Sequence, residues 1–367
     1  SDVPTLIPLC FEDELEMLFD SKNSTSHEFI DNLYDISNKK LYQMIWENIE
    51  PYIENGASVY YSPTGYINKI NISAISDGTM RLSDKYDLYE VSKTAMIESI
   101  KQQKNDEIQS ATLFGNINYY EDSDMMATHS GRYTSYSSGT LMATRSLDRG
   151  TWELLPSTKD EITSIELLLE NTKTSVQVFM LNEANEESFK ALSTNAPDII
   201  HVATHGFFFP SEDDVTTSFF SGLSTSNQKD NSLLYSGLLF AGANNAWIGK
   251  TLAEGVEDGI LTADEVSRLD LTGNKLIVLS ACETGLGDID NINGVFGLQR
   301  GLKKAGVGTI LMSLWKVPDE ETQQLMSVFY EHYLSGESAH QALKVAQQQL
   351  QKQGKSPYYW AGFVLLD

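Results

Sequence analysis

Cysteine is scarce in this chain of 367 residues, and long apolar runs are absent. The only two cysteines, Cys10 and Cys282, lie far apart in the sequence and in unlike contexts. Two such residues exclude a disulfide framework and a Cys-rich metal site, and they favour a reducing compartment. No apolar run approaches the roughly 20 residues that span a bilayer, and the chain shows no signal-peptide pattern. We therefore expect a cytoplasmic protein that does not cross a membrane.

Positive charge is also in short supply. The chain has 26 Lys and Arg residues against 51 Asp and Glu residues, a formal net charge of −25. A field of this sign repels phosphate backbones and anionic lipid headgroups, and it attracts basic segments of other proteins. The composition therefore argues against nucleic acid or a membrane surface as a partner and favours a basic peptide.

The spacing of apolar residues predicts the order of helices and strands. Residues 1–56 are expected to be helical, and a helix end is expected at Asn55-Gly56. From about residue 111, strands alternate with helices, which is typical of an α/β fold with a mainly parallel sheet covered by helices on both faces. The expected strands are 58–61, 67–75, 88–96, 112–119, 176–181, 198–204, 275–280, 309–314 and 358–366, with a hairpin at 237–243.

Two of these strands run directly into residues with nucleophilic chemistry. His205-Gly206 follows the strand at 198–204, and Cys282 follows the strand at 275–280. Ligand sites of parallel sheets lie at the carboxyl ends of the strands, so adjacent strands would bring the two side chains together. The imidazole could then take the thiol proton, and the thiolate could attack a carbonyl carbon. The backbone N–H groups of Gly206 and Cys282 could stabilise the resulting oxyanion.

Taken one at a time, these residues also fit a structural role. A buried cysteine at a strand end is often a small apolar residue, and a histidine after a strand is often an ordinary polar residue. His201 lies inside its strand and is expected to face the interior. The other histidines are expected at the surface or in packing roles: His27, His129, His332 and His340.

Five ordered blocks carry a more specific resemblance. The blocks are HVATHGFF (201–208), LSACETGLG (279–287), GVFGLQRGL (294–302), SLWKVPD (313–319) and PYYWAGF (357–363). Together they resemble the CHAT family of caspase-like cysteine peptidases, which belongs to the same clan as caspases and separase. The resemblance covers roughly residues 60–367 and follows the order of the family's motifs.

The resemblance implies peptide-bond hydrolysis by a dyad, with Cys282 as nucleophile, His205 as base and no cofactor. It implies a helical lead-in at 1–56, an inactive caspase-like part at 57–150 and the active caspase-like part at 151–367. The lead-in could be the end of an upstream repeat module. Relatives are often joined to tetratricopeptide repeats or other sensor modules, and some act in bacterial defence. A fused module or a separate activating protein is therefore an expected partner.

Asp319 is a candidate for recognising the substrate. A carboxylate at the start of a helix is favoured by the helix dipole, which is one reading of this residue. The block that ends at Asp319 also resembles the separase block whose aspartate receives a basic side chain in the S1 pocket. That similarity implies cleavage after Arg or Lys in a protein substrate, because a buried carboxylate pairs with basic groups.

Other segments carry weaker signals. The acids at 288–294 miss the register of a calcium-binding loop, so no metal site is expected. The long insertion at 208–263 and the polar loop at 121–150 are candidate activation or gating segments. A non-catalytic interaction module with a caspase-like fold is the alternative to the enzyme, although the presence of both His205 and Cys282 argues against it.

Overall fold

The computed structural model describes most of the chain. The described residues are 4–19, 26–93, 95, 97–98, 100, 107–133, 150–208, 233–234, 236–280 and 292–367. Cys282 lies outside them, as do residues 134–149 of the expected gating segment at 121–150, residues 209–232 and 235 of the one at 208–263, and residues 288–291 of the acidic run.

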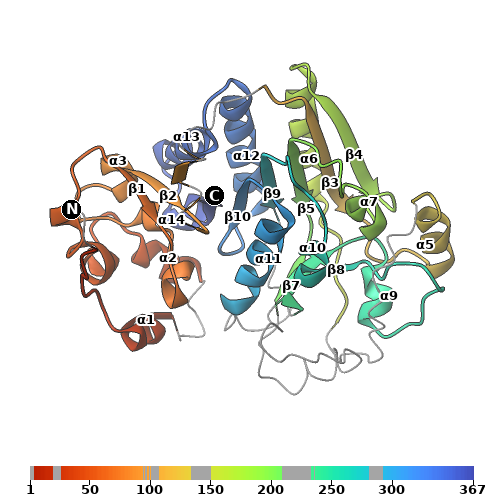
Figure 1. Ribbon diagram of the computed structural model, residues 1–367, viewed down its shortest axis with the longest axis horizontal. Helices are drawn as coiled ribbons and strands as arrows, with labels where there is room; N and C mark the ends of the chain where they lie inside the picture. Colours follow the sequence, from red (N-terminus) through yellow and green to blue (C-terminus); the bar gives the residue numbers. More distant parts are fainter. Residues whose placement is uncertain are drawn as a thin grey trace.

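The centre of the molecule is an eight-stranded sheet with the strand order β1-β2-β11-β10-β9-β5-β3-β4 (Figure 1). Neighbouring strands run parallel except for the antiparallel pair of β10 and β11. The strands are β1 (Ser58–Tyr61), β2 (Asp87–Glu90), β3 (Ser110–Ile117), β4 (Ser175–Leu181), β5 (Ile199–Ala203), β9 (Leu276–Ser280), β10 (Thr309–Ser313) and β11 (Phe363–Leu366). The expected mainly parallel α/β fold is confirmed.

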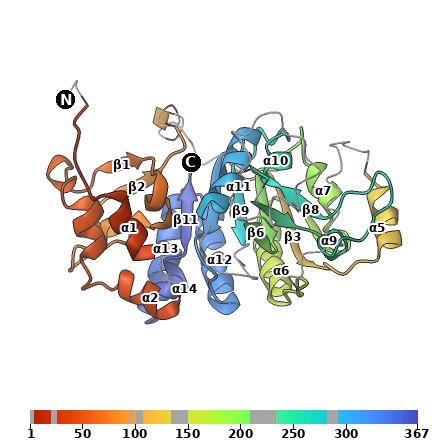
Figure 2. The ribbon, with the colours of Figure 1, turned by 90° about the horizontal axis from the view of Figure 1, so that it is seen from below.

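Helices cover both faces of this sheet (Figure 2). One face carries α6 (Ser157–Glu170), α12 (Asp319–Leu334) and α13 (Ala339–Lys352), and the other carries α7 (Glu186–Lys190), α10 (Ala263–Val266) and α11 (Ile292–Ala305). Strand residues alternate between the two cores, as the period of a strand requires. In β5, Ile199 and Ala203 pack toward α6 and α12, whereas Ile200 and Val202 pack toward α10 and α11.

A smaller antiparallel sheet lies beyond the end of β5. It contains β6 (Gly206–Phe208), β7 (Ser236–Leu239) and β8 (Ile260–Thr262), with β7 in the middle. Only His205 and Thr204 separate β5 from β6 along the chain. The predicted hairpin at 237–243 is wrong, because the chain leaves β7 through Gly242, at a φ of +80°, into α9 (Ala243–Trp247).

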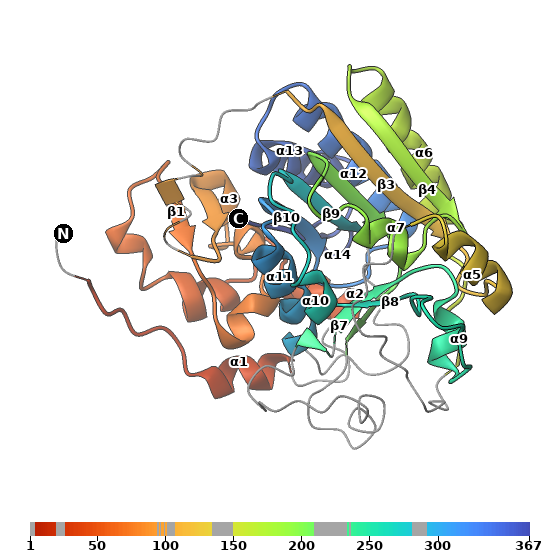
Figure 3. The same cartoon turned by 45° about the vertical axis from the view of Figure 1, so that its right-hand side comes forward.

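The N-terminal segment extends one end of the large sheet and packs on it. Its elements are α1 (Glu12–Phe19), α2 (His27–Leu33), a π-helical turn (Tyr42–Trp46), 3₁₀ turns at Glu50–Tyr52, Gly65–Lys69 and Ile72–Ala74, and α3 (Leu82–Lys85). Strand β2 joins β11 where Glu90 pairs with Leu366, so the C-terminus lies beside the N-terminal strands (Figure 3). The expected division at residues 56 and 150 stays a prediction.

Two expected strands take other forms. Residues 67–75 form 3₁₀ turns, which bury Ile70, Ile72 and Ile75 without joining a sheet. Tertiary bonds hold these turns, because the Asn71 N–H donates to the Tyr34 hydroxyl at 3.0 Å. The last expected strand, 358–366, begins instead as α14 (Pro357–Trp360), and only its second half is the strand β11. In the loop expected at 121–150, the described part contains α5 (Ser123–Ser130).

Candidate active site

Strands β5 and β9 lie side by side and run parallel, as the predicted site requires. Ile199 pairs with Leu276 at one end and Ala203 pairs with Ser280 at the other. Apart from His201 and Ser280, both strands consist of apolar residues, and every residue is buried except Ser280, which is partly so. His205 follows β5 by two residues, and in the sequence Cys282 follows β9 by two residues. The structure thus brings the two strands together, while the position of the thiol lies outside the described residues.

His205 is buried between two aromatic rings. Its side chain is 2% exposed, and its ring centroid lies 4.9 Å from that of Tyr119 and 5.0 Å from that of Trp152. Nε2 lies 2.7 Å from the backbone oxygen of Glu153. A carbonyl oxygen can only accept, so Nε2 carries the proton and Nδ1 has the lone pair that a general base needs.

Asn244, a residue of α9, holds the segment that carries the Glu153 carbonyl in place. The N–H of Trp152 donates to Asn244 Oδ1 at 2.9 Å, and Asn244 Nδ2 donates to the Trp152 oxygen at 3.0 Å. Asn244 is buried, and its own N–H donates to the Tyr119 oxygen at 3.1 Å. A backbone carbonyl therefore orients the imidazole of the expected dyad, in the place that a third side chain would otherwise take. Backbone carbonyls have no sequence signature, so this partner could not be predicted.

Burial controls the protonation of His205. It lowers the pKa of the imidazole from 6.5 to about 4, the Lys316 cation acts in the same direction, and the hydrogen bond to the Glu153 oxygen opposes both. At neutral pH the ring is uncharged and can take a proton. The geometry and the uncharged state suit a general base, while the lowered pKa makes the ring a weaker base than an ordinary imidazole.

The pKa of His205 can be measured directly. In a ¹⁵N-histidine NMR titration, the resonance that His205→Ala removes should change near pH 4, well below the 6.5 of an ordinary histidine. Because the folded pKa is depressed, this group stabilises the fold above pH 6.5, and the contribution is lost as the pH falls through about 4. A midpoint near 6.5 would show that the ring is hydrated.

A small pocket opens where β5, β9 and β10 end. Its volume is about 50 Å³, and the first turns of α6 and α12 close its other side. Its charged and hydroxyl side chains are those of Thr158, Glu161, Thr204, Ser280, Ser313, Lys316, Asp319 and Thr322. Asp319 is the first residue of α12, is exposed, and accepts a hydrogen bond from Ser157 Oγ at 2.6 Å. The candidate recognition residue thus lines a pocket at the same edge of the sheet as His205.

Glu161 is the acidic residue of this pocket that the sequence analysis missed. It lies on α6 and is 5% exposed. The available signal was its place at the spacing i, i+4, i+8 with Ile165 and Leu169, which puts a carboxylate within the apolar stripe of the helix. The same pocket holds Lys316, a cation that no sequence argument placed there.

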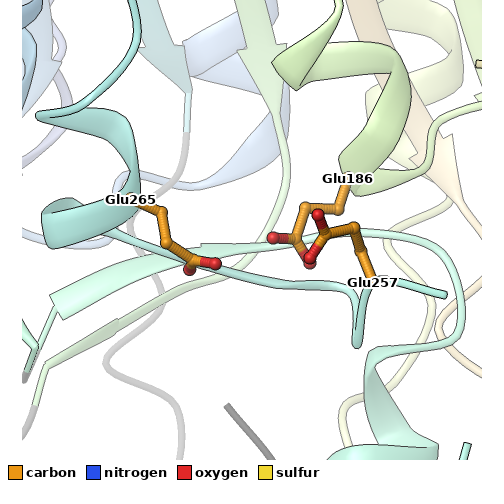
Figure 4. A group of neighbouring side chains, drawn as sticks. All are labelled: Glu186, Glu257 and Glu265. Atoms are coloured by element: carbon orange, nitrogen blue, oxygen red, sulfur yellow. The ribbon is translucent and has the colours of Figure 1, made fainter. Parts of the chain in front are cut away.

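A second group of buried acids lies near the smaller sheet. Glu186, Glu257 and Glu265 face one another at a spacing that could hold a metal ion (Figure 4). However, Nζ of Lys190 lies 2.7, 2.9 and 3.0 Å from their respective carboxylates. The ammonium group occupies the centre of this cluster, so the acids form a buried ion network.

The fold and the position of His205 define the class of this protein. A mainly parallel sheet with helices on both faces, with the candidate base following a central strand, is the arrangement of a caspase-like α/β protein. The CHAT domain model matches residues 35–366, and the chain belongs to the CHAT domain family. The resemblance seen in the five sequence blocks is confirmed.

A curated human protein, tetratricopeptide repeat protein 28, is similar to part of this chain. The two are 27% identical over 245 residues, which is 63% of this chain and 10% of the human protein. This chain therefore spans about a tenth of the length of that relative. Among the described residues, no helix combines the length and the apolar character needed to cross a membrane.

Proposed function

We propose that this protein is a cysteine endopeptidase of the CHAT type, with His205 as the base and Cys282 as the nucleophile. The observation that supports this most directly is the setting of His205. Its Nε2 is tied to the Glu153 carbonyl, and it follows β5, the neighbour of the strand that leads to Cys282. This arrangement leaves Nδ1 in the form that accepts a proton.

The reaction would proceed in two stages. His205 removes the proton of the Cys282 thiol, and the sulfur attacks the carbonyl carbon of the scissile peptide bond. The tetrahedral intermediate collapses to a thioester as the protonated imidazole gives its proton to the leaving amine. A water molecule, deprotonated by His205, then hydrolyses the thioester and releases the acid product. We assign stabilisation of both oxyanions to the N–H groups of Gly206 and Cys282.

The substrate proposed is a protein cut after Arg or Lys. Asp319 supports this, because it lines the pocket beside His205, and so does the net charge of −25. Lys316 in the same lining opposes it, but two carboxylates outnumber one ammonium group there.

We further propose a cytoplasmic protein that a partner or a fused repeat module switches on, in a bacterial defence or signalling system. The similarity to a protein named for tetratricopeptide repeats supports such a module.

The test measures peptide cleavage and covalent labelling by wild type, with Cys282→Ala as the negative control. Wild type should cut fluorogenic peptides with Arg or Lys at P1, and an acyloxymethyl ketone with P1 Lys should form a thioether with Cys282, detected by mass spectrometry. The Ala variant should do neither. If wild type activated by its partner or module neither cuts nor takes the label, the chain is a non-catalytic interaction module with a caspase-like fold.

A further inference from the structure

We propose that Glu161 is a second specificity-determining carboxylate of the pocket, one that receives the charged end of a basic side chain inside the rim formed by Asp319. This inference rests on the proposed peptidase function and deepens it. It follows from the difference between the two acids: Asp319 is exposed, whereas Glu161 is 5% exposed and lines the same pocket.

Glu161 is held rigidly between the two strands that lead to the proposed dyad. Its Oε1 accepts from Nε2 of His201 on β5 at 3.1 Å, and its Oε2 accepts from Oγ of Ser280 on β9 at 3.1 Å. The His201 ring is held in turn by the Tyr330 hydroxyl, 3.1 Å from Nδ1. A carboxylate positioned by bonds to both strands presents a fixed geometry to an incoming group.

The carboxylate retains capacity for a ligand. An ionised carboxylate has about four acceptor positions, and each Glu161 oxygen has one protein donor among the described residues. The pocket beside it is about 50 Å³ and is bordered by hydroxyl groups that can also accept from a cation. It has room for a few water molecules, or for the tip of a long side chain in their place.

Burial decides which of the two acids discriminates more strongly. Water screens an exposed carboxylate such as Asp319, and Ser157 already bonds to it. A charge pair in a less polar setting is stronger, and a neutral side chain in the pocket would leave Glu161 without a new partner. We therefore expect Glu161 to contribute more than Asp319 to the preference for basic over neutral residues.

The preference should be measured as the ratio of kcat/KM for P1 Lys to that for P1 norleucine, its neutral analogue of similar length. Glu161→Gln should lower this ratio about 10–100-fold, the range for a charged hydrogen bond, and Asp319→Asn should lower it less. Glu170→Gln is the matched control, because Glu170 is an exposed residue at the end of the same helix. It should leave the ratio unchanged.

A Glu161→Asp variant guards against misfolding of the Gln variant. Aspartate keeps the negative charge but is shorter by one methylene group, so the variant should retain the preference for basic P1 residues. Because the carboxylate lies deeper, the ratio of kcat/KM for P1 Lys to that for P1 Arg should fall, in favour of the longer Arg side chain. An unchanged Lys to norleucine ratio in a folded Glu161→Gln, or an unchanged Lys to Arg ratio in Glu161→Asp, would overturn the inference. Either result leaves the proposed peptidase function intact as long as cleavage still needs Cys282. If cleavage by wild type does not depend on Cys282, the peptidase function itself is refuted.

Discussion

Replacing His205 by alanine should lower kcat/KM for a cleaved peptide by a factor on the order of 10⁴–10⁶ in the folded variant. Because the ring is buried, the substitution should also reduce stability, so folding of the variant is checked first. The thiol of an ordinary cysteine is only slightly ionised at neutral pH, so cleavage needs a neighbouring base. The structure gives His205 the neutral form that a base requires, with a proton on Nε2, and burial keeps the ring uncharged at neutral pH by lowering its pKa to about 4.

The double variant makes this prediction specific to a dyad. His205→Ala and Cys282→Ala should each cause nearly the full loss, and combining them should add little, because residues that act as one unit are not additive. His332→Ala is a suitable control, since the His332 ring also bonds to an oxygen, that of Glu337 at 2.8 Å, but lies at the far end of α12. Additive losses, or a comparable loss in the control, would remove His205 from the proposed chemistry. Steady-state kinetics with one fluorogenic peptide suffice.

Replacing Lys190 by methionine should reduce the free energy of unfolding by about 3–5 kcal/mol, the usual cost of leaving a buried charge without its partner. Lys190 is buried and pairs with Glu186, Glu257 and Glu265, the three acids drawn in Figure 4. Burial acts to lower the pKa of its ammonium group, but the carboxylates of Glu186 and Glu265 outweigh it and raise the pKa. Methionine fills a similar volume without the charge, so the variant isolates the electrostatic loss.

Urea denaturation should show this loss as a lower midpoint with an unchanged slope. Lys159→Met, at an exposed position on α6, should stay within about 0.5 kcal/mol of wild type. A Lys190→Met loss below about 1 kcal/mol would mean that the acids do not depend on the ammonium group.

Asp258, which lies next to Glu257 in the sequence and interacts with Glu265, should make stability depend on pH. Burial, together with the neighbouring Glu265 carboxylate, raises the pKa of Asp258 from 3.8 to about 8. Because the folded pKa is raised, this group stabilises the fold fully below about 3.8, and its contribution is lost as the pH rises through about 8.

The cluster matters for the candidate site through the smaller sheet, because β8 pairs with β7, and β7 pairs with β6, which follows His205 directly.

The amino-acid sequence by itself determined the central strands and the family, and it predicts the candidate dyad. Mostly apolar runs such as 199–203 and 276–280 are typical of buried strands in a sheet covered on both faces. In the structure their residues alternate between two cores. Chemical groups placed directly after such strands emerge at one edge, so local sequence was enough to propose His205 and Cys282 together.

Only the tertiary structure decided the surroundings of these residues. The Glu153 carbonyl reaches His205 because Asn244, from α9, bonds to the adjacent residue Trp152. Glu161 becomes a pocket residue through bonds to two strands that are distant in the chain. The pattern at 67–75 predicts a strand, but tertiary hydrogen bonds such as that from Asn71 to Tyr34 stabilise turns there instead. In each case the deciding contact joins residues far apart in sequence, which periodicity and local motifs do not encode.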